Sequence, residues 1–205
     1  MQEVDFVNII SRYVPLPAIT ELWKFFGSNV VNLKITKDRV TKFGDFRYSN
    51  GGTKVSQITV NGGLNKYSFL ITLLHEMAHY KVYVQHSKAC KPHGVEWKKA
   101  FQEIVAPFIN SGIFPQPLET VYRKHMQNPR AATHSDMDLL RCLNLYNSES
   151  EVENIHLEDI AFGKKFAFKG RVFIKEEKRR TRYMCTDINS GKKYTINGLA
   201  TIEKV

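Results

Sequence analysis

The sequence predicts an α+β fold, in which a larger helical domain with a small sheet is followed by a small antiparallel β unit. Two observations predict this class. In the first part of the chain, apolar residues recur at helical spacing, most clearly over residues 68–85. From residue 162 onward, apolar and polar residues alternate as they do in antiparallel strands. We therefore assign residues 1–146 to the larger domain, 147–161 to a polar, acidic linker and 162–205 to a basic β-rich unit.

The larger domain is expected to begin with two helices and three short strands. Amphipathic spacing predicts a helix over Val4–Tyr13, and Pro17 favours the start of a second helix, which Gly27 ends. Runs rich in β-branched and aromatic residues predict the strands, which cover residues 30–35, 43–48 and 55–60. These strands supply the small sheet on which the later helices pack.

The segment 68–85 is the strongest helix prediction in the chain. It contains neither Gly nor Pro, and its apolar residues can face a core at helical spacing. Asn65 and Ser68 are both candidates for its N-cap. A second amphipathic helix is predicted to begin near Val95.

The rest of the domain is expected to contain less regular structure. Prolines and a glycine interrupt residues 107–129, which predicts a long irregular region. Ser135 is expected to cap one further helix, from Asp136 to about Tyr146. In the β-rich unit, the alternation predicts three or four strands.

One motif carries most of the chemical information, and it is His75-Glu76-Met77-Ala78-His79, an H-E-x-x-H sequence inside the predicted helix. Residues four apart lie on one face of a helix, so His75 and His79 can present two imidazoles to one Zn²⁺. Glu76 lies on the same turn, where its carboxylate can act as a base toward a water on the metal. The motif therefore predicts a catalytic zinc site with Glu76 as the base.

A catalytic zinc site takes a third protein ligand, for which His93 is the best candidate. His86 lies seven residues beyond His79, which is about 10 Å along a helix and too far to share its metal. Pro92 and Gly94 break the helical structure, so the chain can turn back and present His93 to the helix. Weaker alternatives for the third ligand are two carboxylates and a thiolate, namely Glu96, Glu103 and Cys90.

The pair of motifs His75-Glu76-x-x-His79 and His93-Gly94-x-x-Trp97 resembles the SprT-like zinc metalloproteases. The stretch Phe43-Gly44-Asp45-Phe46-Arg47-Tyr48 is also similar to the strands that precede the active helix of that family. The resemblance extends from about residue 5 to about residue 145.

This resemblance implies a minigluzincin-like metalloprotease domain, in which helices pack on a small three-stranded sheet. It implies that His75, His79 and His93 bind Zn²⁺ and that Glu76 is the catalytic base. The family includes the Spartan proteases, which degrade proteins crosslinked to DNA. A protein substrate associated with DNA is therefore expected.

The cysteines distinguish this chain from many members of that family, which carry a zinc ribbon built from two Cys pairs. Here Cys90, Cys142 and Cys185 are isolated, and the sequence contains no C-x-x-C. A structural zinc site usually takes four ligands in pairs. We therefore expect residues 162–205 to form a ribbon-like unit without its metal.

Bulk properties predict a cytoplasmic protein that does not enter a membrane. Three cysteines without an evident pairing fit a reducing compartment. The first residues are acidic where a signal peptide would be basic, and no apolar stretch reaches 18 residues.

Charge is the second functional clue. The net formal charge is +10, and the segment 163–193 carries eleven Lys or Arg residues against three acidic ones. Basic residues interleaved with aromatic ones suit non-specific contact with DNA phosphates. The contacts are expected from a cluster at or near a hairpin tip, formed by Lys178, Arg179, Arg180 and Arg182. The alternative is a solvated hairpin whose charges protect sheet edges.

Two functions follow from these patterns. The first is a zinc-dependent endopeptidase that acts on DNA-associated or DNA-crosslinked proteins. The second is a non-enzymatic DNA-binding adaptor with a structural zinc site. Glu76 favours the enzyme, because a structural site needs no base beside its metal.

Overall fold

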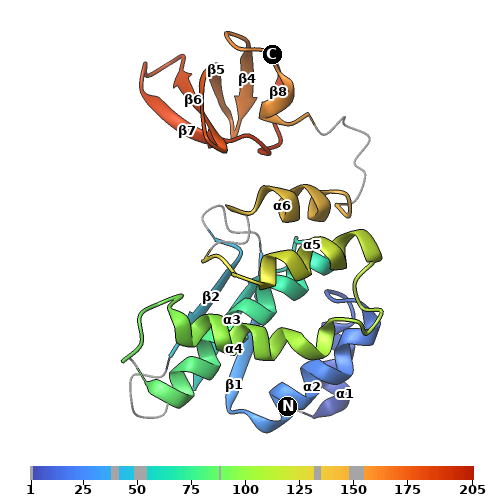
Figure 1. Ribbon diagram of the computed structural model, residues 1–205. Coiled ribbons are helices and arrows are strands. Elements are labelled where there is room, and N and C mark those ends of the chain that lie inside the picture. The colour runs from blue at the N-terminus through green and yellow to red at the C-terminus, as the bar shows by residue number, and fades with distance from the viewer. Residues whose placement is uncertain (1, 38–41, 49–54, 88, 132–134, 148–154) are drawn as a thin grey trace. The chain divides into compact units, whose positions relative to one another are not determined.

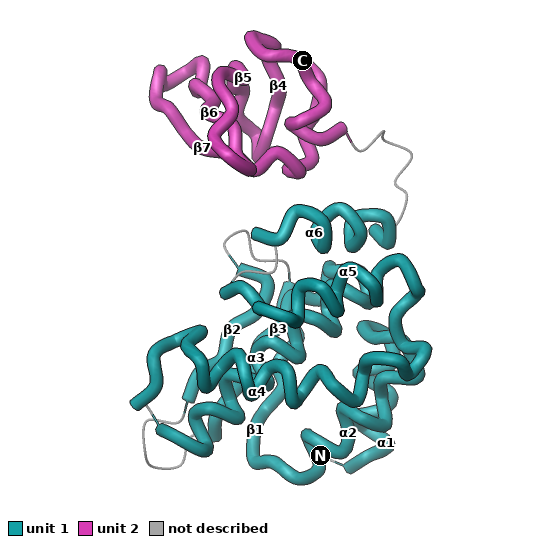
Figure 2. Tube along the Cα trace, viewed as in Figure 1, with its two compact units in different colours: residues 1–147 teal, residues 148–205 magenta. Residues whose placement is uncertain are grey.

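The computed structural model describes residues 2–37, 42–48, 55–87, 89–131, 135–147 and 155–205. The chain divides into two compact units, which are unit 1 (residues 1–147) and unit 2 (residues 148–205; Figure 2). The described part of unit 1 holds six α-helices and a three-stranded sheet, and that of unit 2 holds a five-stranded antiparallel sheet (Figure 1). The predicted α+β class is confirmed.

Unit 1 alternates helical and sheet segments in the order that the sequence predicts for its first half. Its helices are α1 (Glu3–Ile10), α2 (Ile19–Ser28), α3 (Lys66–His86), α4 (Val95–Val105), α5 (Gln116–Met126) and α6 (Met137–Asn144), with 3-10 turns at Leu16–Ala18 and Ala106–Phe108. Its strands are β1 (Val31–Thr36), β2 (Gly44–Arg47) and β3 (Ser56–Asn61).

The sheet of unit 1 is centred on β3, which pairs parallel to β1 and antiparallel to β2. Ile58 and Val60 of β3 are fully buried. Helix α3 packs against β2 and β3 on one side and against α4 on another (Figure 1). The sheet and α4 therefore enclose the helix that carries the H-E-x-x-H motif.

Helix α3 has a defined start and an apolar surface on most sides. The Asn65 side chain accepts hydrogen bonds from the backbone N–H of Tyr67 at 3.1 Å and of Ser68 at 2.9 Å, so Asn65 is the N-cap and Ser68 lies inside the helix. Leu70 and Leu74 are among its fully buried residues. A helix that is apolar almost all round belongs in the middle of a core.

The prediction of a long irregular region over residues 107–129 is wrong, because α5 occupies much of it. Pro115 precedes α5 and Pro117 lies in its first turn, where a missing N–H costs nothing. Apolar residues four apart then bury one face of the helix, as Leu118 and Tyr122 show. The last helix, α6, is capped by Asp136, which accepts from the Leu139 N–H, and not by Ser135.

Unit 2 has its own small core and sheet. Its strands are β4 (Lys165–Phe168), β5 (Arg171–Arg179), β6 (Arg182–Asp187), β7 (Lys193–Asn197) and β8 (Glu203–Lys204), in the spatial order β7-β6-β5-β4-β8. The buried residues of its apolar cluster are Leu157, Phe166, Phe173, Tyr183, Cys185, Ile196 and Ile202. The sequence therefore predicted the strand pattern but missed the two-residue strand β8.

Residues 155–161, which the sequence assigns to the linker, are part of unit 2. A short 3-10 turn at Leu157–Asp159 packs on the sheet, and Leu157 is fully buried. The Leu157 N–H donates to the Ala200 carbonyl at 3.0 Å. We call residues 155–162 the strap. Of the rest of the predicted linker, Asn147 is the last residue of unit 1, and residues 148–154 lie outside the described residues.

Lys175 ties this strap to β5 from inside unit 2. It is only 2% exposed, and its Nζ donates to the carbonyl of Ile160 at 2.6 Å and of Glu158 at 3.2 Å. The ammonium group also lies 4.0 Å from the centre of the Tyr183 ring and 5.1 Å from that of Phe162. Burial lowers the pKa of the Lys175 ammonium. The Lys175 charge interacts with groups inside unit 2, so it cannot contact a phosphate in solution.

Among the described helices, none combines the length and the hydrophobicity that a membrane span requires.

A candidate metal centre

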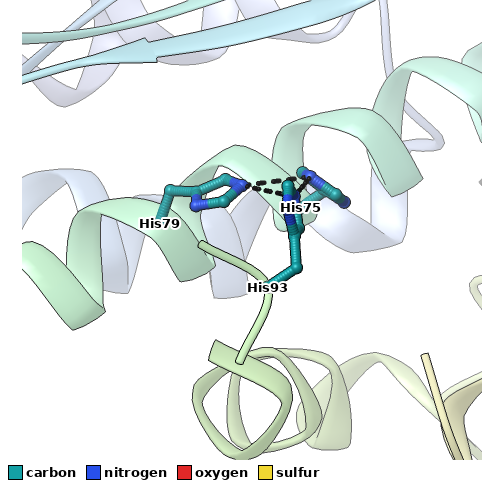
Figure 3. Close-up of side chains that lie close together, drawn as sticks. All are labelled: His75, His79 and His93. Carbon is teal, nitrogen blue, oxygen red and sulfur yellow. Dashed lines mark hydrogen bonds between the residues drawn. The ribbon is translucent and has the colours of Figure 1, made fainter. Parts of the chain in front are cut away.

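The three histidines singled out by sequence spacing meet at one point (Figure 3). His75 and His79 project from one face of α3, and His93 approaches from the segment before α4. Their Nε2 atoms form a nearly equilateral triangle, with distances of 3.2 Å for His75–His79, 3.0 Å for His79–His93 and 3.2 Å for His93–His75.

The dimensions of this triangle fit a small tetrahedral metal ion. Zinc binds imidazole nitrogen at about 2.0–2.1 Å, so two ligands of a tetrahedral zinc lie about 3.3 Å apart. The observed separations of 3.0–3.2 Å are close to that value. The three ring nitrogens all lie within 4.8 Å of one another, and each can offer a lone pair to the same point. A cation at their centre would satisfy the whole set.

The position of His93 depends on a tight turn. The Gly94 N–H donates to the Lys91 carbonyl at 2.9 Å, which closes a four-residue turn with Pro92 and His93 in its centre. His93 has φ of +57°, the left-handed conformation that the third residue of a type II turn requires and that glycine usually supplies. A non-glycine residue at positive φ carries local strain. The strain places an imidazole where the turn alone would favour glycine.

Gly94 is required at the last position of this turn. A Cβ at Gly94 would lie 2.9 Å from the Lys91 carbonyl oxygen. The backbone approaches itself so closely that only glycine fits without a shift. Each residue of the Pro-His-Gly sequence therefore has a role in the turn. Pro92 and His93 occupy its two central positions, and Gly94 allows the close approach to the Lys91 carbonyl.

Burial keeps the three imidazoles neutral. Burial holds the pKa of His75 well below its ordinary value, and a proton on His79 or His93 would lower it further. Burial, with a contribution from His93, lowers the pKa of His79 to about 4. Burial also lowers the pKa of His93. Neutral imidazole is the form that binds a metal, so the site needs no deprotonation step near pH 7.

Trp97 forms the floor beneath the three rings. Its ring centroid lies 4.7 Å from His75, 5.4 Å from His79 and 4.7 Å from His93. Phe101, one turn further along α4, packs on both Trp97 and His75. This apolar packing fixes the ring planes and excludes water from one side of the triad.

The triad opens on the other side to a cavity of about 630 Å³, a size typical of ligand-binding pockets. Two carboxylates line it in the described part of the chain, Glu76 and Asp45. Asp45 is ion-paired with Lys42 at 2.6 Å and Arg47 at 2.8 Å, and these contacts lower its pKa despite the opposing effect of burial. Glu76 directly follows His75 on α3, so it is the better candidate for a base beside the triad.

The other candidates for a third ligand lie elsewhere. His86 is exposed at the end of α3, and Glu96 is exposed at the start of α4. Glu103 forms an ion pair with Lys81 at 2.7 Å. Cys90 lines the cavity but is not in the group of side chains that converge. Among the described residues, only His75, His79 and His93 form such a group.

One residue of the site, Gly44, has a role that the sequence analysis missed. Gly44 lines the cavity from β2 and lies against Glu76. A glycine inside a predicted strand is a known sign of close backbone approach, so the signal was present in the sequence.

Three histidines on a helix and a following turn could hold a metal ion, and they open to a cavity that a carboxylate also lines. A model of the SprT-like family matches residues 19–122, which are 104 of the 205 residues. The chain belongs to the SprT-like family, whose domains are metalloprotease-like. The searches of curated proteins and of solved structures gave no match.

The predicted nucleic-acid cluster lies on the β5–β6 hairpin of unit 2. Arg179 pairs with Arg182 across the strands, so Arg180 and Thr181 form a two-residue loop. Arg180 has φ of +52°, at a loop position where glycine is usual. Arg179 is ion-paired with Glu177, and the Lys178 Nζ lies 5.8 Å from the centre of the Tyr183 ring.

The three acidic residues of the segment 163–193 are all ion-paired with cations of the same segment. The pairs are Arg171–Asp187, Arg179–Glu177 and Lys193–Glu176. With Lys175 buried, seven of the eleven cations are exposed and form no ion pair among the described residues. They are Lys164, Lys165, Lys169, Lys178, Arg180, Arg182 and Lys192.

Proposed function

We propose that this protein is a zinc-dependent endopeptidase. The observation that carries the proposal is the near-equilateral triangle of His75, His79 and His93 Nε2 atoms, 3.0–3.2 Å apart, at a cavity that Glu76 also lines. Membership of the SprT-like family supports it. When bound there, zinc supplies Lewis-acid chemistry, by lowering the pKa of a coordinated water and polarising a carbonyl.

The residues of the chain divide the remaining work. Glu76 accepts a proton from the attacking water while the new C–O bond forms at the scissile carbonyl carbon. It then delivers this proton to the amine nitrogen as the C–N bond breaks, so it ends the cycle unprotonated. Trp97 and Phe101 hold the imidazole planes, and the neutral imidazoles leave the full charge of the metal to act on the substrate.

The sheet offers a place for an extended polypeptide beside the triad. In the described residues, β2 is an edge strand, because β3 covers only one of its sides. Gly44, Asp45 and Phe46 of β2 line the cavity. An extended peptide can add to such an edge through main-chain hydrogen bonds. We therefore propose that a protein substrate lies along β2, with its scissile bond near Glu76.

The test is substitution of Glu76 by Gln, assayed on an unfolded protein such as casein after loading with zinc. The amide cannot accept the proton, so the rate of cleavage should fall by several orders of magnitude while zinc content is retained. Glu76→Asp, which keeps a shorter carboxylate, is the matched control and should retain part of the activity. Equal cleavage by wild type and Glu76→Gln would show that Glu76 is not the base.

We further propose that the substrates are proteins bound or crosslinked to DNA, which unit 2 contacts without sequence preference. The support is the set of seven exposed Lys and Arg residues of the segment 163–193 that form no ion pair among the described residues. The three free cysteines also suit a reducing compartment, and we propose a cytoplasmic location. The alternative function is a DNA-binding adaptor in which zinc only stabilises unit 1. It would show DNA binding and zinc content equal to those of the enzyme, but no cleavage that depends on Glu76.

A further inference from the structure

The backbone approaches the Glu76 side chain closely at Gly44. This residue is the first of β2, where it pairs with Val60 of β3. A Cβ at Gly44 would lie 2.6 Å from Glu76 Oε1, 2.9 Å from Glu76 Cγ and 2.7 Å from Thr72 Cγ2. All three distances are shorter than any normal carbon contact. Strand β2 thus lies directly against the Glu76 side chain.

The backbone conformation of Gly44 does not require glycine. Its φ lies outside the left-handed region, unlike that of Gly112, Gly163, Gly170 and Gly191. An alanine could therefore adopt the same backbone geometry. The absence of a side chain at this position is a steric requirement alone, set by what faces it.

Of the two side chains that face Gly44, that of Glu76 is the longer and also lines the cavity. The Thr72 hydroxyl donates to the Ser68 carbonyl at 2.7 Å, which fixes the orientation of its methyl group. Strand β2 is held in register by β3 from Gly44 to Arg47. The Glu76 side chain has three rotatable bonds and lines the cavity, and an added methyl would meet it at both Cγ and Oε1. The methyl would therefore turn the whole side chain and displace the carboxylate.

We propose that Gly44 is a positioning residue, whose missing side chain leaves the space in which the Glu76 carboxylate stands when it takes the proton. This inference rests on the proposed peptidase function. A shift of about 1 Å in a reacting group can cost about 100-fold in rate. Strand β2 therefore has two roles. It lines the cavity, and through Gly44 it orients the Glu76 side chain.

The test is Gly44→Ala, measured in the full-length zinc-loaded protein. We expect kcat to fall by about 100-fold, with KM changed less than about threefold, because the base moves while the cavity stays. Zinc content should match that of wild type, because the groups nearest to the new methyl are Glu76 and Thr72. The melting temperature should fall, because the Thr72 methyl group is fixed and crowds the new side chain. Insoluble protein, or loss of zinc together with activity, would overturn the proposal, since Gly44 would then be a structural residue.

Two further variants sharpen the test. Gly27→Ala adds a methyl where the nearest atom, in the Trp23 ring, is at an ordinary 3.4 Å, so it should leave kcat unchanged. Thr72→Ser in the Gly44→Ala background keeps the hydrogen bond to Ser68 but removes the Cγ2 methyl. It should raise kcat at least tenfold above that of Gly44→Ala by letting the new methyl move away from Glu76. A double variant no more active than Gly44→Ala would overturn the steric explanation.

Failure of this inference and failure of the proposed function give different results. If wild type shows no cleavage that Glu76→Gln abolishes, the peptidase function is wrong. If wild type is active and Gly44→Ala is equally active with its zinc, only the role of Gly44 is wrong.

Discussion

In unit 1 three imidazole nitrogens face one another at 3.0–3.2 Å, whereas in unit 2 a buried ammonium group is surrounded by groups that match it. Lys175 has two carbonyl oxygens and two aromatic rings around its Nζ. Asp187 of the same unit accepts from the Ser190 N–H at 2.7 Å and pairs with Arg171, and these contacts hold its pKa below its usual value.

This difference in partners indicates that the Lys175 site has a structural role and the histidine triad a functional one. Buried polar groups in folded proteins are normally satisfied by complementary partners, as in unit 2. The triad of unit 1 repeats one kind of group three times, and one of its members, His93, is also held at positive φ. Three like groups close together, one of them in a strained turn, do not stabilise a fold. The arrangement therefore points to a ligand that complements all three.

Removal of His93 should have the largest effect on the metal centre. His93→Gly should lower zinc affinity by at least about 10-fold to 100-fold, because only two of the three ligands remain. The same change supplies the residue that the type II turn prefers, so the melting temperature of the metal-free protein should not fall. Isothermal titration with zinc and thermal unfolding in a chelator measure the two effects.

His86→Ala is the matched control for that experiment. His86 is exposed at the end of α3 and outside the triad, so its removal should leave zinc affinity unchanged. If His93→Gly bound zinc as tightly as wild type, the third ligand would have to be sought among the rejected alternatives. A fall in metal-free stability would instead mean that His93 is held by its own packing.

Local sequence signals were sufficient for the triad but not for everything around it. Spacing on α3 fixes the relation of His75 to His79, and the Pro-His-Gly turn locates His93 within a few residues of a helix start. Helix α5 was missed because prolines at its start were interpreted as breaks throughout. The contact of Gly44 with Glu76 joins residues that are far apart in the chain, which no local pattern specifies.

Unit 2 shows the same limit for charge. The number of cations in a segment is visible in its sequence, but the direction of each side chain depends on the register of the sheet. Lys175 looks like its basic neighbours in sequence, yet the alternation along β5 places it inside, with Phe173. The number of cations that can contact a phosphate therefore depends on the strand register and on the ion pairs, which the sequence alone does not give.

A second variant removes the hydrogen bonds that the Lys175 ammonium group donates inside unit 2. Lys175→Met keeps the length of the side chain but leaves the carbonyls of Glu158 and Ile160 without their donor. An unsatisfied buried group costs about 1–3 kcal/mol, so hydrogen exchange of the β5 and β6 amides should accelerate by about 10-fold or more in the full-length protein.

Tryptophan fluorescence supplies an internal control for the Lys175 variant. Both tryptophans, Trp23 and Trp97, lie in unit 1, so the midpoint of their unfolding transition should not change. Lys165→Met removes an exposed lysine of β4 and should leave exchange within about twofold of wild type. Unchanged exchange in Lys175→Met would show that the strap is held by Leu157 and its neighbours alone.

The smallest expected effect concerns the exposed cations of the hairpin and tests whether they have a partner at all. Replacing Arg180 and Arg182 with Gln should weaken binding to duplex DNA of any sequence. It should also reduce the magnitude of the slope of log affinity against log salt by up to about 1.8, because each phosphate that an arginine neutralises adds about 0.9 to that slope.

Arg179→Gln is the matched control. Arg179 already pairs with Glu177, so its replacement should change the slope much less. Zinc content should not change in either variant, since both lie outside unit 1. If wild type shows no salt-sensitive DNA binding, the hairpin charges are edge protection, and the polar groups of unit 2 serve its structure throughout.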